Sequence, residues 1–183
     1  MGRRLVLAGG LASAVAGLTT SEAAAASAAE LDHDAAAALE QLYSTNPRAR
    51  ELGKRSHAIL IFPKVVKAGL VVGGLTGQGA LRQGNRSIGY YRITAGTYGL
   101  QAGAQSYSYA LFFITQSSLD YLKRSDGWSI GSGPSVVVID EGVAGSLNST
   151  TLTQDVYVAI FGQRGLMAGL GLEGAKISKI NLR

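Results

Sequence analysis

Short apolar runs broken by frequent glycines fill the middle of the chain, residues 59–116, and this pattern predicts strands rather than helices. β-Branched and aromatic residues dominate the runs, and glycine recurs every few positions. The same segment contains no cysteine, histidine, aspartate or glutamate, so it offers no thiol, imidazole or carboxylate for catalysis. All of its charged side chains are cationic, which points to binding an anion rather than to transforming a substrate.

Two helices are predicted before this segment. Residues 29–42 are rich in alanine, leucine and glutamate, which favour a helix. The residues that share its apolar face are Leu31, Ala35, Ala38, Leu39 and Leu42. The pair Asn46-Pro47 predicts a break, with Thr45 or Asn46 as the N-cap of a second, short and basic helix over residues 47–55.

The later elements are predicted as strands separated by turns. Residues 58–62 form a first run that Pro63 should end, the glycine cluster 73–79 should form a turn or bulge, and Gly84-Asn85 should close a hairpin. One short helix, residues 117–124, is predicted with a serine cap. The other predicted strands are residues 68–75, 79–83, 87–94, 97–115 (two strands or one bent strand), 135–140, 155–162, 166–173 and 176–180.

Composition narrows the possible functions. The chain of 183 residues is long enough for one domain with a packed core, and 46% of its residues are hydrophobic. It has no cysteine, which excludes disulfides, thiolate catalysis, cysteine-bound metals and a lipid anchor on cysteine. Its net charge of +5 favours partners that carry phosphate, either nucleic acid or anionic lipid.

The N-terminal segment, residues 1–28, is predicted to be an export signal. Arg3 and Arg4 precede an uncharged apolar stretch, and the small residues that follow permit cleavage before Ala29 or a few residues earlier. An uncleaved membrane anchor is the alternative, and the sequence leaves the Sec and twin-arginine routes open. Removal of the signal takes away two arginines and one glutamate, so the net charge falls from +5 to +4. Residues 29–183 are then expected to form one domain.

The sequence contains no pattern typical of an active site. It lacks both the phosphate-loop motif and the Gly-x-Ser-x-Gly motif of serine hydrolases. Its two histidines, His33 and His57, lie far apart in sequence, and the acid pair Asp140-Glu141 is interpreted as a solvated strand end. We therefore predict no enzymatic activity, no metal and no cofactor.

One basic cluster stands out as a candidate binding surface, and Glu51 is the only acid within it. Its members are Arg48, Arg50, Lys54, Arg55, Lys64 and Lys67. Cations this close in sequence create a local positive potential that suits an anionic membrane surface, while a simply solvated helix is the alternative. Four tyrosines could stack on bases, but an exported protein seldom meets nucleic acid, so nucleic acid is not the expected partner.

Several ordered sequence blocks resemble the SYLF domain family, and the likeness runs from about Leu42 to Ile180. These blocks are Ile61-Phe62-Pro63-Lys64-Val65-Val66-Lys67-Ala68-Gly69, Gly79-Ala80-Leu81, Gly89-Tyr90-Tyr91, Gly99-Leu100-Gln101-Ala102-Gly103-Ala104-Gln105-Ser106-Tyr107, Ser125-Asp126-Gly127-Trp128, Phe161-Gly162-Gln163-Arg164-Gly165-Leu166-Met167-Ala168-Gly169 and Leu172-Glu173-Gly174-Ala175-Lys176-Ile177. The resemblance implies lipid binding, with phosphoinositides bound by eukaryotic relatives and phospholipid contacted by exported bacterial ones. One departure is that many relatives carry an acid in the segment 73–79, where this chain has none.

Together these inferences predict a β-dominated α+β domain, with N-terminal helices packed on a strongly twisted, largely antiparallel, glycine-rich sheet or partly closed barrel. The expected function is binding of anionic phospholipids with phosphoinositide-like headgroups, without catalysis. The expected location is the periplasm or the surface of the cell envelope, peripheral to the membrane. Actin is not expected as a partner of an exported protein. The alternative function is an envelope structural or protein-interaction module.

Overall fold

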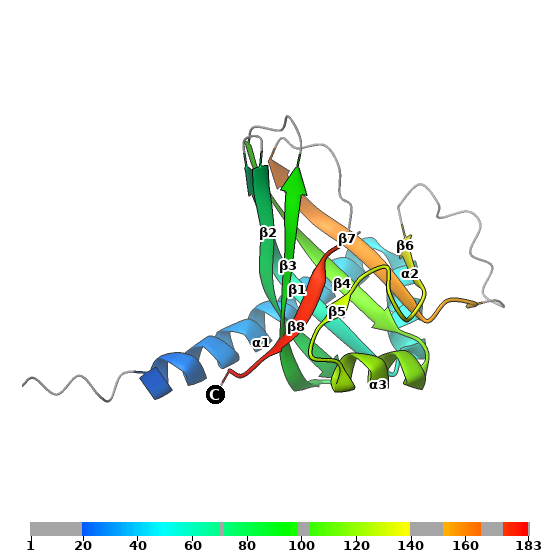
Figure 1. The fold of residues 1–183 in the computed structure, drawn as a ribbon. Coiled ribbons are helices and arrows are strands. Elements are labelled where there is room, and N and C mark those ends of the chain that lie inside the picture. The colour runs from blue at the N-terminus through cyan, green and yellow to red at the C-terminus, as the bar shows by residue number, and fades with distance from the viewer. Residues whose placement is uncertain (1–19, 70–71, 99–102, 140–151, 166–173, 183) are drawn as a thin grey trace, which may run out of the picture.

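A computed structural model of the protein describes residues 20–69, 72–98, 103–139, 152–165 and 174–182 (Figure 1). These residues form three helices and eight strands. The elements are α1 (Thr20–Thr45), α2 (Pro47–Arg55), β1 (Ala58–Gly69), β2 (Val72–Gln83), β3 (Arg86–Tyr98), β4 (Gly103–Phe113), α3 (Gln116–Arg124), β5 (Trp128–Ser129), β6 (Val136–Ile139), β7 (Val156–Gly165) and β8 (Lys176–Ile180).

All eight strands belong to one sheet with the order β5-β8-β3-β2-β1-β4-β7-β6. Neighbouring strands are antiparallel except for β6, which runs parallel to β7. The sheet twists strongly and curls into a half-barrel, with the helices on its outside and at its end (Figure 1). The predicted fold class, a β-dominated α+β domain with a largely antiparallel sheet, is confirmed.

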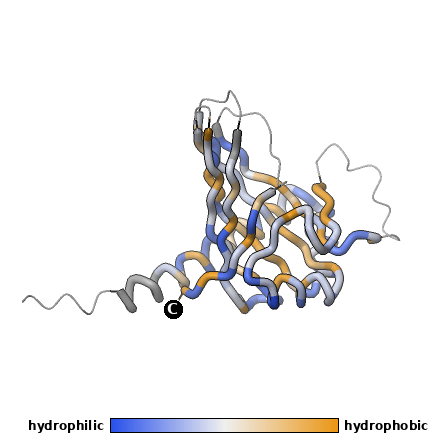
Figure 2. Tube along the Cα trace, viewed as in Figure 1, coloured by the Kyte–Doolittle hydropathy of each residue, from blue (hydrophilic) through white to orange (hydrophobic). Residues whose placement is uncertain are grey.

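Apolar residues pack on both faces of this sheet, so the strands are buried on two sides where the helices cover them. On one face, Ala35, Ala38 and Leu42 of α1 and Ala49 and Leu52 of α2 pack against alternate strand residues. On the other face, side chains of α3 and the β5 region pack against the remaining strand residues. Figure 2 shows the hydrophobic residues running through the strands in the lower half of the sheet.

Two predictions about β1 and β2 are wrong. Pro63 does not end β1. At this point β1 carries one extra residue relative to β2 and to β4, and a bulge of this kind accommodates proline, which has no amide hydrogen to donate. The glycine cluster 73–79 is not a turn but part of β2. Glycine is needed at Gly79 because a Cβ there would lie 2.5 Å from Cδ1 of Phe62 and 2.6 Å from the carbonyl oxygen of Ile61.

Most other predicted elements are present with shifted bounds. The hairpin at Gly84-Asn85 is confirmed, and the first helix contains the predicted residues but begins at Thr20. The short third helix is capped by Thr115, whose hydroxyl accepts a hydrogen bond from the Ser118 amide, rather than by a serine. The predicted strand 166–173 and residues 1–19 of the predicted signal lie outside the described residues. The predicted cleavage point before Ala29 lies within α1.

Asp155 joins three elements at the start of β7. Its Oδ2 accepts hydrogen bonds from the Ser135 amide at 3.0 Å and the Ser135 hydroxyl at 2.9 Å, and its Oδ1 accepts one from Thr115 at 3.0 Å. Ser135 precedes β6 and Thr115 caps α3, so one carboxylate fixes both to β7. The hydrogen bonds from the Ser135 amide and hydroxyl, followed by that from Thr115, hold the pKa of Asp155 below its usual value.

We expect Asp155→Asn to lower the free energy of unfolding by about 1–2 kcal/mol at neutral pH. Because the folded-state pKa lies below the ordinary value of 3.8, the carboxylate contributes its stability above that pH and loses it as the pH falls further. The difference between the native protein and the variant should therefore shrink below about pH 4. Urea unfolding of both proteins across that range measures it, and a difference that stays constant with pH would contradict the assignment.

Candidate functional site

The cationic helix α2 is fixed in place by its cap and its apolar residues. Oδ1 of Asn46 accepts hydrogen bonds from the Arg48 amide at 3.1 Å and the Ala49 amide at 3.0 Å, and Pro47 occupies the first turn. Ala49 and Leu52 are buried against the sheet with α1. The opposite face of α2 therefore has to point to solvent.

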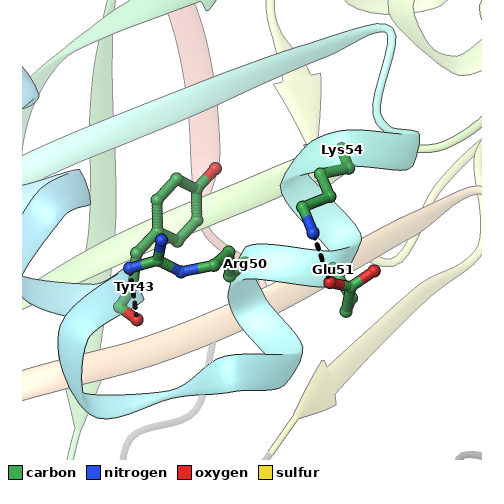
Figure 3. A network of polar contacts seen from close by, with 4 residues as sticks. All are labelled: Tyr43, Arg50, Glu51 and Lys54. Atoms are coloured by element: carbon green, nitrogen blue, oxygen red, sulfur yellow. Dashed lines mark hydrogen bonds and ion pairs between the residues drawn. The ribbon is translucent and has the colours of Figure 1, made fainter.

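That outward face carries most of the predicted basic cluster. Arg50, Lys54 and Arg55 are exposed, and Arg48 is half-buried. Figure 3 shows Arg50 lying over the ring of Tyr43, with its guanidinium carbon 5.8 Å from the ring centroid, while it donates a hydrogen bond to the Tyr43 carbonyl at 3.3 Å. This contact holds one cation close to the helix surface.

Glu51 partly offsets the charge of this face. Nζ of Lys54 lies 2.6 Å from Oε1 of Glu51, as Figure 3 shows. The hydrogen bond from Lys54, and then the charges of Lys54, Arg55 and Arg50, hold the pKa of Glu51 below its usual value. Both partners are exposed, so this ion pair contributes little to stability. The face keeps an excess of positive charge.

The two lysines of β1 point to opposite faces of the sheet. Val65, between them, packs in the core on the α3 side, and side chains alternate along a strand, so Lys64 points to the α1 side and Lys67 to the α3 side. Lys67 is only 8% exposed and pairs in register with Leu75 of β2 and Gln105 of β4. The six predicted cations therefore do not form one continuous surface.

Lys64 instead lines a cavity of about 510 Å³ between α1 and the sheet. The other lining residues are Asp34, Ala37, Ala38 and Gln41 of α1, Pro63 of β1, Ser106, Tyr107 and Ser108 of β4, and Gly162, Gln163 and Arg164 of β7. The lining thus brings two cations, one carboxylate, two amides and two serine hydroxyls to the same hollow. Such a set suits a small, polar, charged ligand.

Sequence reasoning missed every polar residue of this cavity except Lys64. Arg164 lies within a block quoted for the family resemblance, but about a hundred residues separate it from Lys64 in the chain. Only the register of β7 on β4 and of β4 on β1 brings the two together. Asp34 and Gln41 flank the apolar face of α1, and a polar residue at the border of such a face indicates by itself only partial or full exposure.

Among the described residues, no group of three or more histidine, aspartate or glutamate side chains is placed to hold a metal ion. Within the same part of the chain, none of the helices is long and apolar enough to cross a bilayer.

Comparison with known proteins gives one result. Residues 94–181 match the family model Ysc84, described as "Las17-binding protein actin regulator". No curated protein matches the chain. This is the family of the SYLF domain, so the resemblance inferred from the sequence is confirmed over these residues. The match includes the β4 and β7 residues that line the cavity, and it begins after α2, β1 and β2.

Proposed function

Because residues 94–181 carry a domain of the Ysc84 (SYLF) family, which is associated with lipid binding, we propose that this protein is a non-enzymatic module that binds anionic phospholipid membranes. The membrane-facing surface is the outer face of α2. The protein acts after export, at the periplasmic or outer side of a membrane, as its N-terminal sequence indicates. Actin, named in the family description, is then not its partner.

The observation that carries this proposal is a rigid helix with a cationic outer face. Ala49 and Leu52 hold α2 against the core, so its outer face presents Arg50, Lys54 and Arg55, with Arg48 half-buried and Glu51 as the one acid among them. Each Lys or Arg near an anionic membrane surface contributes about 1 kcal/mol to binding, and the pairing of Lys54 with Glu51 reduces the sum for this face. The apolar residues of α2 are not available for insertion, so binding through this face is electrostatic.

The alternative is an envelope module that pairs with a partner through glycine-rich strand edges, and β2 does not offer such an edge. The glycine-rich strand β2 lies between β1 and β3 and pairs with both along its length. Its backbone groups are therefore already engaged and do not offer an edge to another chain.

Flotation with lipid vesicles tests the proposal. The full-length chain is expressed, and the protein that the cell makes from it is purified. It is mixed with vesicles of phosphatidylcholine alone, or of phosphatidylcholine and phosphatidylglycerol, at low and at high salt. We expect flotation only with the anionic vesicles, weakened by salt because screening shortens the range of the attraction.

The variant Arg48→Gln/Arg50→Gln/Lys54→Gln/Arg55→Gln should bind anionic vesicles at least about tenfold more weakly. The matched control neutralises four exposed cations elsewhere, by Arg86→Gln, Arg92→Gln, Lys123→Gln and Lys179→Gln. It changes the net charge equally and should lose much less binding. Equal losses would show that net charge rather than α2 is responsible, and absence of flotation from every vesicle would refute the proposal.

A further inference from the structure

We propose that the cavity between α1 and the sheet binds one polar headgroup, whose phosphate lies between Lys64 and Arg164 and whose hydroxyl or ammonium end faces Asp34. This inference rests on the proposed function, and it adds a specific site to the electrostatic surface of α2. The ligand class is a phosphate joined to a small hydrogen-bond donor, as in glycerol phosphate or ethanolamine phosphate.

The floor of the cavity is built by irregularities in the two strands that flank β4. β1 carries its extra residue at Pro63, and β7 carries one at Gly162 and Gln163, between its pairs with Ser106 and Ser108 of β4. Gly162 has a φ of +64°, a conformation that favours glycine. The hydroxyl of Ser108 donates a hydrogen bond to the Pro63 carbonyl at 2.8 Å, which fixes the bulge from the middle strand. Bulges of this kind re-aim the side chains beside them.

The two cations lie on the strands to either side of β4, with Lys64 two residues before the position that pairs with Ser106. Ser106 pairs in register with Val66 of β1 and with Arg164 of β7, and Lys64 and Arg164 both have exposed side chains. Their strands are separated by β4 alone, and Lys64 is offset by two residues along β1, so their backbones lie roughly 12 Å apart. A phosphate above Ser106 is within reach of both long side chains, and the guanidinium of Arg164 has the geometry for paired hydrogen bonds to phosphate oxygens.

The opposite wall is part of α1, which is itself held in place. The Tyr90 hydroxyl donates to Oδ2 of Asp32 at 3.0 Å, and Nη1 of Arg82 donates to the Asp32 carbonyl at 3.4 Å. Asp34 and Gln41 supply the polar groups of this wall, and the small side chains of the alanines at positions 37 and 38 leave the space between them open.

Size and charge select the ligand class. A cavity of about 510 Å³ lies within the usual range of roughly 300–1,000 Å³ for small-molecule sites and is larger than one phosphate ion needs. Its lining is mostly polar, which does not suit an acyl chain. Two cations and one carboxylate match a molecule with an anionic end and a donor end, which is the chemistry of a phosphorylated headgroup.

The first experiment uses soluble probes with the full chain and isothermal titration calorimetry. We expect sn-glycerol 3-phosphate to bind, inorganic phosphate to bind more weakly, and glycerol not to bind. Lys64→Gln and Arg164→Gln should each weaken binding of glycerol phosphate about tenfold, the usual loss for one charged hydrogen bond. Asp34→Asn should weaken binding of glycerol phosphate but not of inorganic phosphate, because Asp34 contacts only the donor end.

The second experiment identifies the source of the headgroup, by flotation of the double variant Lys64→Gln/Arg164→Gln with phosphatidylglycerol vesicles. The charge-matched control is Arg86→Gln/Arg92→Gln, and thermal unfolding verifies that both variants are folded. A larger loss for the cavity variant supports a lipid headgroup as the ligand. Binding of glycerol phosphate with no such loss supports a soluble phosphate ester.

The experiments can refute either proposal without refuting the other. If glycerol phosphate does not bind and the cavity variant floats like its control, the cavity inference is overturned, while loss of flotation in the α2 variant still supports the proposed function. If the α2 variant floats normally and the cavity variant does not, the assignment to the α2 face is overturned and the cavity remains as the site.

Discussion

Trp128→Ala is expected to lower the free energy of unfolding by about 3–5 kcal/mol, the usual range for removal of a large buried aromatic side chain. Trp128 is 1% exposed and packs against Phe113, with ring centroids 6.1 Å apart. Its Nε1 donates a hydrogen bond to the Ser132 carbonyl at 2.8 Å, which closes the loop after β5. Because β5 pairs with β8 through only two residues, this side chain and the backbone hydrogen bonds of Ile130 to Gly174 and Ala175 attach that edge.

Urea unfolding measures the effect. It is followed by far-ultraviolet circular dichroism, because tryptophan fluorescence would be lost in the variant. The matched control is Tyr121→Ala, which removes an aromatic side chain that is 38% exposed, and it should cost less than about 1 kcal/mol. Trp128→Phe separates packing from hydrogen bonding, because it keeps most of the ring volume and loses Nε1. If Trp128→Ala lowers the free energy of unfolding no more than Tyr121→Ala does, the β5 edge does not depend on Trp128.

Gly79→Ala should lower the free energy of unfolding by about 1–3 kcal/mol, although it adds a single methyl group. The new carbon would lie 2.5 Å from Cδ1 of Phe62 and 2.6 Å from the Ile61 carbonyl oxygen. The first contact is with a fully buried ring and the second is with the backbone of β1, so neither can move away cheaply. The bulge at Pro63 would have to shift, and the floor of the cavity would shift with it.

Gly96→Ala is the control for this prediction, because a Cβ at Gly96 meets nothing within 4 Å in the same sheet. Its effect should be neutral or slightly stabilising, since alanine reduces the conformational freedom of the unfolded chain. Denaturant midpoints of the two variants give the comparison. Equal midpoints would show that β1 and β2 adjust without strain.

Local patterns in the sequence were sufficient for the helices and the hairpin. Alanine-rich composition and the spacing of Leu31, Ala35, Ala38 and Leu42 identified α1 and its buried face, and Asn46-Pro47 identified the start of α2. These features depend on neighbours a few residues away, which a sequence displays directly. The same local rules failed at Pro63 and at residues 73–79, where proline and glycine usually end a strand.

The candidate site was only partly predictable for the same reason. The basic character of α2 is visible in the sequence, and the exposure of its cations follows from the burial of Ala49 and Leu52. The separation of Lys64 from Lys67 onto opposite faces depends on the strand that contains them continuing past Pro63, which local rules deny.

The sequence by itself determined the β-rich fold class, the two N-terminal helices, the family likeness confirmed over residues 94–181 and the positive charge available to an anionic partner. Tertiary structure alone decided which cations share a surface. Lys64, Arg164 and Asp34 line one cavity because β1, β4 and β7 are adjacent in the sheet and α1 packs beside them. Strand order and register depend on contacts between distant residues and on the packing of whole faces, so they are set by the folded sheet and not by any local run of residues.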